Sequence, residues 1–528
     1  MPKLTIDNRE VEVPEGATLL QAANKLGIQI PTLCYMPGLP AATSCMVCVV
    51  RNVRTNKLVP SCATVATENL VIESDSEEVH AARRSALELL LSEHLGDCEA
   101  PCHRICPAHM DIPTMIRQIA AGDMPAAIRT VKADIALPAI LGRICPELCE
   151  RGCRRKEVDQ PVSICLLKRY AADVDLASGD PYLPEKLPDS GKRVAIVGAG
   201  PAGLAAAWYT LIGGHAVTVF DDGDQPGGAL REIDPQRLQP EAVDAEIDVI
   251  RRLGADIQTG RKLGDSLSLD QLRGGFDVVI LALGHLEEDE LRTLGLPAGA
   301  RGIDADLDTM ATPIDGVFAA GAIVRPINKQ AVRAVADGKH AAFAANAWLA
   351  GKPLPKITKP LSVNIGKLRE GEPERFMELA SDSPRQKPAA PNDPLDTHQA
   401  VTEATRCLHC DCRKPHTCRL RIFAEQYGAA TNVYRTERPD FQQNLEHPEV
   451  IYEPGKCIYC GLCVRITEQE GEEFGLNFVG RGFRVKVGVP MNRSMVQALS
   501  RTAHKVVEAC PTGALAFRDD VPAETSTD

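Results

Sequence analysis

The sequence predicts a multidomain protein of mixed α/β and α+β class, and three observations support this class. Cysteines occur in four separate groups, and the densest one, between residues 94 and 165, contains seven of the 19. A glycine-rich motif lies between an apolar strand and a helix near residue 200. The first 75 residues contain short alternating runs that are typical of strands. With 528 residues, the chain is long enough for several domains of about 100 to 200 residues each.

Composition excludes several classes of partner. The net charge of −12 argues against a nucleic-acid backbone, and the aromatic content of 4% offers no platform for stacking bases. No apolar run approaches the roughly 20 residues that a membrane span needs. The first ten residues are too polar for a secretory signal, and we therefore expect a cytoplasmic protein.

Residues 1–75 read as two strands about a turn, a helix near ATLLQAANKLG, and a second strand pair. They carry four cysteines: Cys34, Cys45, Cys48 and Cys62. This region resembles the β-grasp 2Fe-2S ferredoxin module of the large iron–sulfur subunit of respiratory complex I and of its iron hydrogenase relatives. The resemblance implies one 2Fe-2S cluster on these four thiolates. Zinc also uses four cysteines, but the strand and helix frame favours the cluster.

Residues 76–185 contain the seven densely spaced cysteines, and we expect them to bind metal clusters. Thiolates three and four positions apart suit a short loop around a soft cluster, whereas disulfides would require a secreted chain. Residues 76–97 predict one helix, EEVHAARRSALELLLSEHLGD. In the complex I subunit a similar helix ends in H-x3-C with the histidine as a cluster ligand, and His94 and Cys98 match this motif.

From Cys98 onward, the motifs DCEAPCHRIC and GRICPELCERGC resemble the helical two-cluster domain of the glutamate synthase small subunit and of the N-terminal half of dihydropyrimidine dehydrogenase. That family has a further cysteine at the position of Leu95, and the neighbouring His94 is the natural substitute. The resemblance implies one 4Fe-4S cluster on His94, Cys98, Cys102 and Cys153. It implies a second on Cys106, Cys145 and Cys149; some relatives complete this set with a polar residue near Lys168, but we favour Cys165.

Residues 190–350 begin with an apolar strand, a G-x-G-x-x-G motif, a helix and a second strand that ends in an acid. This combination is specific for a dinucleotide, because the glycines admit a pyrophosphate and the acid binds ribose hydroxyls. The region resembles the Rossmann-like FAD domain of the glutamate synthase small subunit family. The residues expected to bind FAD are Gly198, Gly200, Gly203, Asp221, Gly227, Gly228 and Gly321.

Two departures from this family have consequences for function. Some thirty residues separate Gly284 from Gly316, too few for the second nucleotide domain that delivers hydride from NADPH in the family. The chain is therefore not expected to bind NAD(P)H itself. Ala322 also replaces the acidic residue that contacts the flavin in relatives. The alternative to FAD binding is therefore that this domain keeps the fold as a structural scaffold and binds no flavin.

The last two groups of cysteines follow a proline-rich linker at 351–400. Residues 401–435 are expected to form a metal knot, which binds either zinc or 4Fe-4S through Cys407, Cys410, Cys412 and Cys418. Residues 436–528 resemble the C-terminal 4Fe-4S ferredoxin-like part of the complex I subunit. The resemblance implies one cluster on Cys457, Cys460, Cys463 and Cys510.

Together these parts predict an oxidoreductase with one 2Fe-2S cluster, three 4Fe-4S clusters or four, and FAD. The main hypothesis is an electron-transfer subunit with no catalytic residues of its own. It would connect an NAD(P)H-, formate- or hydrogen-linked partner to a second redox partner, and an NADH- and FMN-binding diaphorase-type subunit is the favoured partner. The alternative is a self-contained FAD and iron–sulfur oxidoreductase that acts on a small molecule. A non-catalytic scaffold for the cluster modules is a third interpretation.

Overall fold

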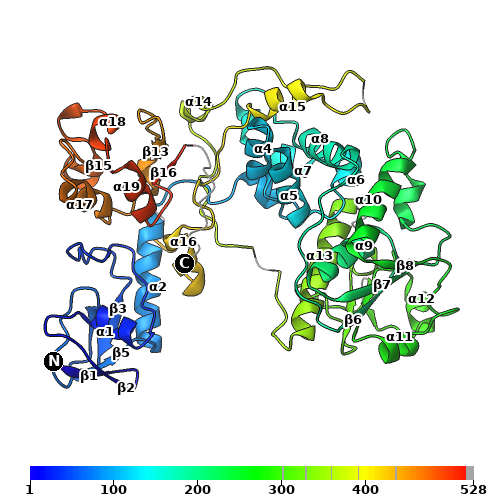
Figure 1. Cartoon of the computed structure of the whole chain (residues 1–528), viewed down its shortest axis with the longest axis horizontal. Helices are drawn as coiled ribbons and strands as arrows, with labels where there is room; N and C mark the ends of the chain where they lie inside the picture. The colour runs from blue at the N-terminus through cyan, green and yellow to red at the C-terminus, as the bar shows by residue number, and fades with distance from the viewer. Residues whose placement is uncertain (300–301, 328–329, 358, 391, 435–436, 519–528) are drawn as a thin grey trace. The chain divides into compact units, whose positions relative to one another are not determined.

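The computed structural model describes residues 1–299, 302–327, 330–357, 359–390, 392–434 and 437–518 (Figure 1). The predicted C-terminal module therefore extends beyond the described residues at 519–528. The chain forms two compact units. Unit 1 consists of Met1–Glu99, Pro360–Arg375 and Cys410–Asp528, and unit 2 consists of Ala100–Lys359 and Phe376–His409. Each unit thus combines segments that lie far apart in the sequence.

Unit 1 begins with a five-stranded mixed sheet in the order β2-β1-β5-β3-β4. Strands β1 and β5 are parallel, and the other neighbouring pairs are antiparallel. Helix α1 (Leu19–Lys25) starts at a capping box in which Thr18 and Gln21 exchange hydrogen bonds. The strands are β1 (Lys3–Ile6), β2 (Arg9–Glu12), β3 (Val49–Asn52), β4 (Lys57–Pro60) and β5 (Val71–Glu73). This is the predicted β-grasp arrangement.

Helix α2 (Glu77–Ser92) joins this sheet to the rest of unit 1. Its buried Arg83 donates to the carbonyl of Val49 at 2.9 Å and to the hydroxyl of Tyr427 at 2.8 Å. Tyr427 directly follows α16 (Arg419–Gln426). A charged side chain near the N-terminus thereby connects segments more than 300 positions apart, which sequence periodicity does not reveal.

The C-terminal part of unit 1 is a small α+β module. Strands β13 (Val450–Tyr452) and β16 (Leu515–Phe517) pair antiparallel, so residues from both ends of the module lie side by side. The other elements are α17 (Leu462–Gln469), β14 (Asn477–Val479), β15 (Lys486–Gly488), α18 (Met495–Ala498) and α19 (Ala503–Ala509). The antiparallel closure brings the remote Cys510 back toward the motif that starts at Cys457.

Unit 2 begins with short helices. Asp111 caps α4 (Ile112–Ala120) and Asp123 caps α5 (Met124–Asp134) by accepting from backbone N–H groups, and a proline follows each cap within the first turn. The buried Glu246 accepts from the N–H groups of Ala139 and Ile140 at 2.7 and 2.9 Å, so α10 (Pro240–Leu253) caps α6. The helices are α3 (Pro101–Ile105), α4 (Ile112–Ala120), α5 (Met124–Asp134), α6 (Pro138–Ile144), α7 (Leu148–Gly152) and α8 (Ile164–Ala177).

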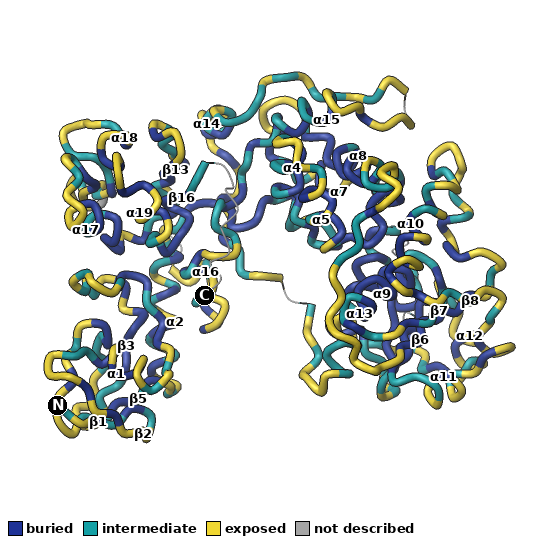
Figure 2. Tube along the Cα trace, viewed as in Figure 1, coloured by how far each residue is buried: buried dark blue, intermediate teal, exposed yellow. Residues whose placement is uncertain are grey.

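The second part of unit 2 is a parallel five-stranded sheet in the order β12-β9-β6-β7-β8. Helices α9 (Pro201–Ile212) and α13 (Ala331–Leu349) are largely buried beside it (Figure 2). They approach so closely that a Cβ on Gly338 would lie 2.1 Å from the carbonyl oxygen of Ala202. The strands are β6 (Arg193–Val197), β7 (Ala216–Phe220), β8 (Asp256–Gln258), β9 (Val278–Leu281) and β12 (Val317–Ala319).

The region between β9 and β12 is small, as the sequence predicts. Its described residues form α12 (Glu288–Thr293) and a hairpin of β10 (Ala298–Gly299) and β11 (Gly302–Ile303). A second nucleotide-binding domain is absent from the described part of this region. The predicted fold class is confirmed.

The residues of the predicted linker are divided between the two units. The part up to Lys359 belongs to unit 2, Pro360–Arg375 belongs to unit 1, and the described residues from Phe376 onward belong to unit 2 again. There the buried Arg155 donates to the carbonyl oxygens of Ser381 and Arg406 at 2.8 and 2.9 Å. Arg406 is itself buried and pairs with Glu403 at 2.8 Å. These buried charged groups, rather than apolar periodicity, hold the segment against the helices.

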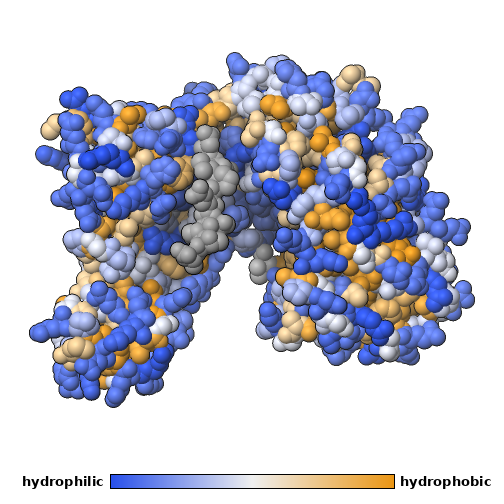
Figure 3. Space-filling model, in the orientation of Figure 1, coloured by the Kyte–Doolittle hydropathy of each residue, from blue (hydrophilic) through white to orange (hydrophobic). Residues whose placement is uncertain are grey.

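Most of the surface on the face shown in Figure 3 is hydrophilic. Among the described residues, no helix is both long and apolar enough to cross a membrane.

Candidate functional site

The four N-terminal cysteines are buried, and they interact as two pairs. The thiol of Cys45 lowers the pKa of Cys34 to about 5, and that of Cys62 lowers the pKa of Cys48 to about 6, in each case by a hydrogen bond. The pKa of the partner thiol rises, since each pair shares a proton. Two adjacent pairs of sulfur atoms match the two tetrahedral irons of a 2Fe-2S cluster, so the residues fit this group.

The four C-terminal cysteines line one apolar cavity. Burial raises the pKa values of Cys457 and Cys460 to about 12, so both thiols need a metal in order to ionise at neutral pH. The N–H of Tyr459 points at the sulfur of Cys457 at 3.4 Å, as cluster sulfur atoms require. The cavity is lined by Cys457, Cys460, Cys463 and Cys510, with Tyr452, Leu462, Val487 and Leu515 among its apolar walls. This set fits a 4Fe-4S cluster.

Arg465 on α17 links these two groups. Its Nη2 atom donates to the carbonyl oxygens of Cys34 at 3.1 Å and Cys460 at 3.0 Å. Its Nη1 atom donates to the carbonyl of Pro40, in the loop that follows Cys34, and its Nε atom donates to Gly461. One guanidinium therefore holds a loop of the N-terminal module against a loop of the C-terminal module. Nothing in the sequence marks this arginine, because its acceptors are backbone carbonyls.

A third group of cysteines lies among the helices of unit 2. Cys106, Cys145 and Cys149 line a cavity together with Lys168. The thiol of Cys165 interacts with those of Cys145 and Cys149, so the structure brings Cys165 to the same place. Although burial alone would lower the pKa of Lys168, the negative charges of these four cysteines raise it. The four thiols fit a 4Fe-4S cluster, with Lys168 as a buried cation beside it.

The remaining expected ligands occur in both compact units, and their grouping stays a prediction. His94 and Cys98 belong to unit 1, whereas Cys102 and Cys153, their expected partners, belong to unit 2. The expected metal knot is also divided, with Cys407 in unit 2 and Cys410, Cys412 and Cys418 in unit 1. Burial and, to a smaller extent, the charge of Lys456 lower the pKa of His94 to about 4. Its imidazole is therefore neutral and suited to metal coordination.

The glycine motif forms a sharp turn between β6 and α9. A Cβ on Gly198 would lie 2.3 Å from the Ala282 carbonyl oxygen, and one on Gly203 would lie 1.8 Å from that of Gly198. Gly200 differs, because no described atom lies within 4 Å of the position that a Cβ would take there. A Cβ on Gly228 would lie 3.1 Å from the Gly200 Cα atom, so the PGGAL loop reaches the same turn. The open space at Gly200, at the start of α9, fits a pyrophosphate.

Asp221 lies at the end of β7, but its carboxylate also stabilises the glycine turn. Oδ2 accepts from the N–H of Ala199 at 2.6 Å, and Oδ1 accepts from that of Gly223 at 3.0 Å. The predicted contact with ribose stays a prediction. Gly321 has a φ of 81°, and a Cβ there would lie 2.8 Å from that of Ala202, so this glycine lets the segment after β12 approach α9.

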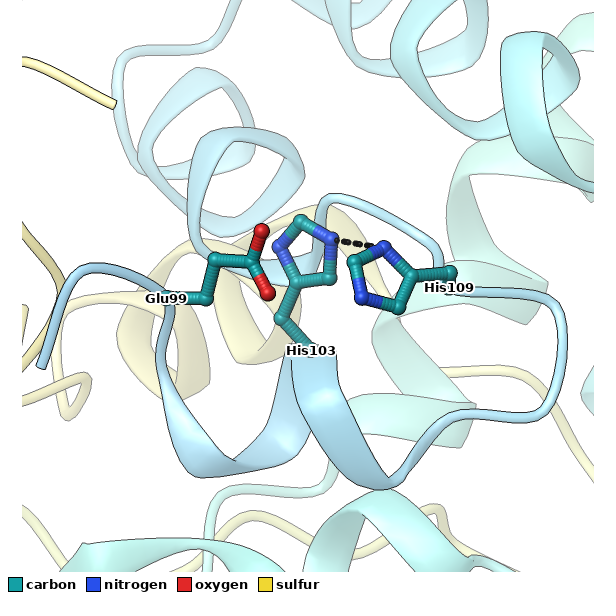
Figure 4. A group of neighbouring side chains, drawn as sticks. All are labelled: Glu99, His103 and His109. Carbon is teal, nitrogen blue, oxygen red and sulfur yellow. Dashed lines mark hydrogen bonds between the residues drawn. The ribbon is translucent and has the colours of Figure 1, made fainter. Parts of the chain in front are cut away.

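A pair of histidines was not anticipated from the sequence. The Nε2 atom of His103 lies 2.9 Å from the Nδ1 atom of His109, so one of the two nitrogens carries the shared proton (Figure 4). Both residues belong to unit 2 and flank Cys106. The left-handed backbone of His109, with φ of 53°, turns its ring toward His103.

Four models of known domain families match the chain. They are a 2Fe-2S iron–sulfur cluster binding domain at residues 2–77 and the 4Fe-4S cluster domain II of dihydropyrimidine dehydrogenase at 74–180. A pyridine nucleotide-disulphide oxidoreductase model matches residues 167–338. The ferredoxin-like domain of NADH-quinone oxidoreductase subunit 3 matches residues 448–516.

Curated relatives match over part of their length. The chain is 37% identical over 207 residues to the beta subunit of an NADPH-Fe(3+) oxidoreductase of Geobacter sulfurreducens, which covers 38% of this chain and 31% of that protein. It is 37% identical over 189 residues to the NAD-dependent dihydropyrimidine dehydrogenase subunit PreT of Escherichia coli, a match that covers 35% of this chain and 46% of that protein. It is 36% identical over 199 residues to the small chain of an NADPH glutamate synthase of Mycobacterium tuberculosis, covering 37% and 40%.

The chain thus spans less than half the length of these relatives. The matches confirm the resemblances expected from the cysteine and glycine motifs. In chain order, the protein carries a 2Fe-2S domain, a 4Fe-4S domain of the dihydropyrimidine dehydrogenase type, a flavoprotein domain of the pyridine nucleotide-disulphide oxidoreductase type and a complex I-type ferredoxin-like domain.

Proposed function

We propose that this chain is an iron–sulfur flavoprotein electron-transfer subunit of a cytoplasmic oxidoreductase complex. The observation that carries the proposal is the contact made by Arg465 between the loops of Cys34 and Cys460. The loop that carries an expected 2Fe-2S ligand and the loop that carries an expected 4Fe-4S ligand therefore lie side by side in unit 1. Adjacent one-electron carriers of different type are the arrangement expected of a relay.

The two kinds of cofactor would have different roles in electron transfer, because iron–sulfur clusters carry single electrons and FAD exchanges electrons singly or in pairs. The residues of the chain position these groups and set their surroundings. Arg465 fixes the two cluster loops, Lys168 places a positive charge beside four cysteines, and Gly200 leaves room at the start of α9.

The partner that feeds the relay is proposed to oxidise NAD(P)H, formate or hydrogen. The resemblance to complex I subunits favours an NADH- and FMN-binding diaphorase-type subunit. The short region between β9 and β12 supports the need for such a partner, since the described residues there form no nicotinamide domain. The names of the relatives, which include oxidoreductase and dehydrogenase subunits, agree with a place in a larger redox complex. The many cluster cysteines favour a reducing compartment.

Anaerobic reduction of the purified holoprotein tests the proposal. We expect dithionite to bleach the visible absorbance, and NADH and NADPH to leave it unchanged. The immobilised chain is then used to capture binding proteins from an extract of the same cells. When the captured proteins are added back, NADH, NADPH, formate or hydrogen should bleach the visible absorbance of the chain. Direct bleaching of the isolated chain by NADH or NADPH would contradict the proposal. Turnover of a small acceptor with no partner present would favour the self-contained oxidoreductase instead.

A further inference from the structure

Three cysteines that the sequence assigns to two different metal sites lie in the same part of unit 1. The family resemblance places Cys98 in a central cluster, whereas the spacing of Cys412 and Cys418 places them in the expected metal knot at 401–435. In the structure all three are buried within unit 1. Cys98 and Cys418 are members of one buried apolar cluster that also includes Val363.

The loop after α2 presents Cys98 to this region. The N–H of Cys98 donates to the Val363 carbonyl at 3.3 Å, and the N–H of Val363 points at the Cys98 sulfur at 3.4 Å. Gly96, with φ of 149°, admits the side chain of Lys456, whose Cε atom would lie 2.7 Å from a Cβ at that position. The loop is therefore fixed on one side by residue 363 and on the other by Lys456.

Cys412 lies next to the same lysine. A Cβ on Gly513 would lie 2.3 Å from the Cys412 sulfur and 3.6 Å from the Lys456 Cδ atom. Only glycine allows the backbone after Cys510 to approach this sulfur so closely. The side chain of Lys456 consequently lies beside both the Cys98 loop and Cys412.

Cys418 is the N-cap residue of α16, and its backbone N–H donates to the Lys414 carbonyl at 3.2 Å. Cys418 lies in the same buried apolar cluster as Cys98. Cys412 lies beside Lys456, the lysine that also packs against the Cys98 loop. A metal group binds buried cysteines such as these as thiolates.

His94 supplies the fourth donor of the region. Its Nδ1 atom is buried, and no described residue forms a hydrogen bond with it. A buried nitrogen without a partner is costly unless it binds something else. His94 is four positions before Cys98 at the end of α2, so the same loop carries both residues.

We propose that His94, Cys98, Cys412 and Cys418 form one 4Fe-4S site that joins the N-terminal and C-terminal segments of unit 1. This ligand set replaces Cys102 and Cys153 by two cysteines from a segment more than 300 positions later. It does not depend on the proposed function, because it concerns only which residues bind one metal group.

The surroundings favour a cluster over zinc, although three thiolates and one imidazole suit both. The Nζ atom of Lys414 donates to the Cys510 carbonyl at 3.1 Å, and the N–H of Leu420 donates to the Pro511 carbonyl at 3.4 Å. The site is thereby tied to the cluster site that ends at Cys510.

Paired substitutions test which cysteines share a cluster. Cys98→Ala and Cys412→Ala should each remove about four iron atoms and the same EPR signal of the dithionite-reduced protein, as loss of one 4Fe-4S cluster requires. The double variant should lose no more than either single variant. The EPR signal lost in Cys98→Ala should be retained in Cys102→Ala. The matched double variant Cys98→Ala/Cys106→Ala should lose about twice as much iron, because Cys106 lies in the separate site of Cys145 and Cys149. The opposite pattern, or loss of zinc in place of iron, would overturn the proposal.

The wild-type holoprotein provides a test that does not depend on folding of a variant. Protein labelled with ¹⁵N only in histidine should show a histidine nitrogen coupled to one reduced 4Fe-4S cluster in pulsed EPR. His94→Cys should abolish the coupling and retain the iron. The unchanged EPR signal of the 2Fe-2S site at Cys34–Cys62 serves as the control for folding. Absence of histidine coupling from every reduced cluster would overturn the assignment of His94.

Discussion

Arg465 offers the most direct perturbation of the contact between the two ends of the chain. Two of its hydrogen bonds join the modules, those to the carbonyls of Cys34 and Pro40, and the other two stay within the C-terminal module. Hydrogen bonds from a charged donor contribute about 1.5 to 3 kcal/mol each. Because Arg465 is half-buried, water compensates part of the loss in Arg465→Ala, and we take the lower value for each intermodule bond.

The two bonds then sum to about 3 kcal/mol, which corresponds to an increase on the order of 100-fold in the opening equilibrium of the Cys34 loop. Hydrogen exchange of residues 33–41, measured by mass spectrometry on anaerobic holoprotein, should accelerate by a similar factor. Arg465→Lys keeps the charge but not the planar fork of donors, so its effect should be intermediate. Unchanged exchange of residues 33–41 in Arg465→Ala would refute the role given to this arginine.

Three further predictions concern unit 2. Burial raises the pKa of Glu246 to about 7 despite its two backbone donors. Since the folded protein binds this proton more tightly than the unfolded chain, about 3 kcal/mol of stability present below about pH 4.5 should be lost as the pH rises to about 7. Glu246→Gln should flatten this part of the pH profile of thermal unfolding, and an unaltered profile would contradict the shift. Gly200→Ala should weaken flavin retention and leave the melting temperature of the flavin-free protein unchanged, since a Cβ there meets no described atom within 4 Å. Gly203→Ala should destabilise the fold itself, because its Cβ would collide with a carbonyl oxygen at 1.8 Å. Flavin content and melting curves of the flavin-free protein distinguish the two variants, and full flavin content in Gly200→Ala would refute the proposed pyrophosphate position. Lys168→Met should retain iron but lower the reduction potential of the adjacent cluster, while Cys165→Ala should lose iron. Iron analysis and a redox titration followed by EPR check both variants. Loss of iron only in Lys168→Met would instead make the lysine the ligand.

Local features could be predicted from the sequence, because short motifs of neighbouring residues determine them. The β-grasp sheet follows from alternating strands. The turn at Gly198 and Gly203 follows from the need for close backbone approach, which the structure shows directly. Likewise, the short region between Gly284 and Gly316 correctly indicated the lack of a second nucleotide domain among the residues described there.

Features that depend on contacts between distant segments could not be predicted in this way. The spacing of Cys412 and Cys418 predicts a local metal knot, but it does not reveal that Cys418 shares a buried cluster with Cys98 or that Cys412 lies beside Gly513. Arg465 acts through backbone carbonyls, which any sequence supplies. The carboxylate of Asp221, which is expected to contact a ribose, also accepts from the N–H groups of Ala199 and Gly223. In each case the residue type indicated the kind of interaction, but the sequence did not show which residue would be its partner.

The central claim is that cluster groups held by this chain relay electrons to other proteins. Its most direct test is the iron, acid-labile sulfide, zinc and flavin content of the protein purified without oxygen. The account predicts a coloured protein with iron and sulfide in nearly equal amounts, bound flavin and little zinc. A colourless protein that is rich in zinc and poor in acid-labile sulfide would contradict it.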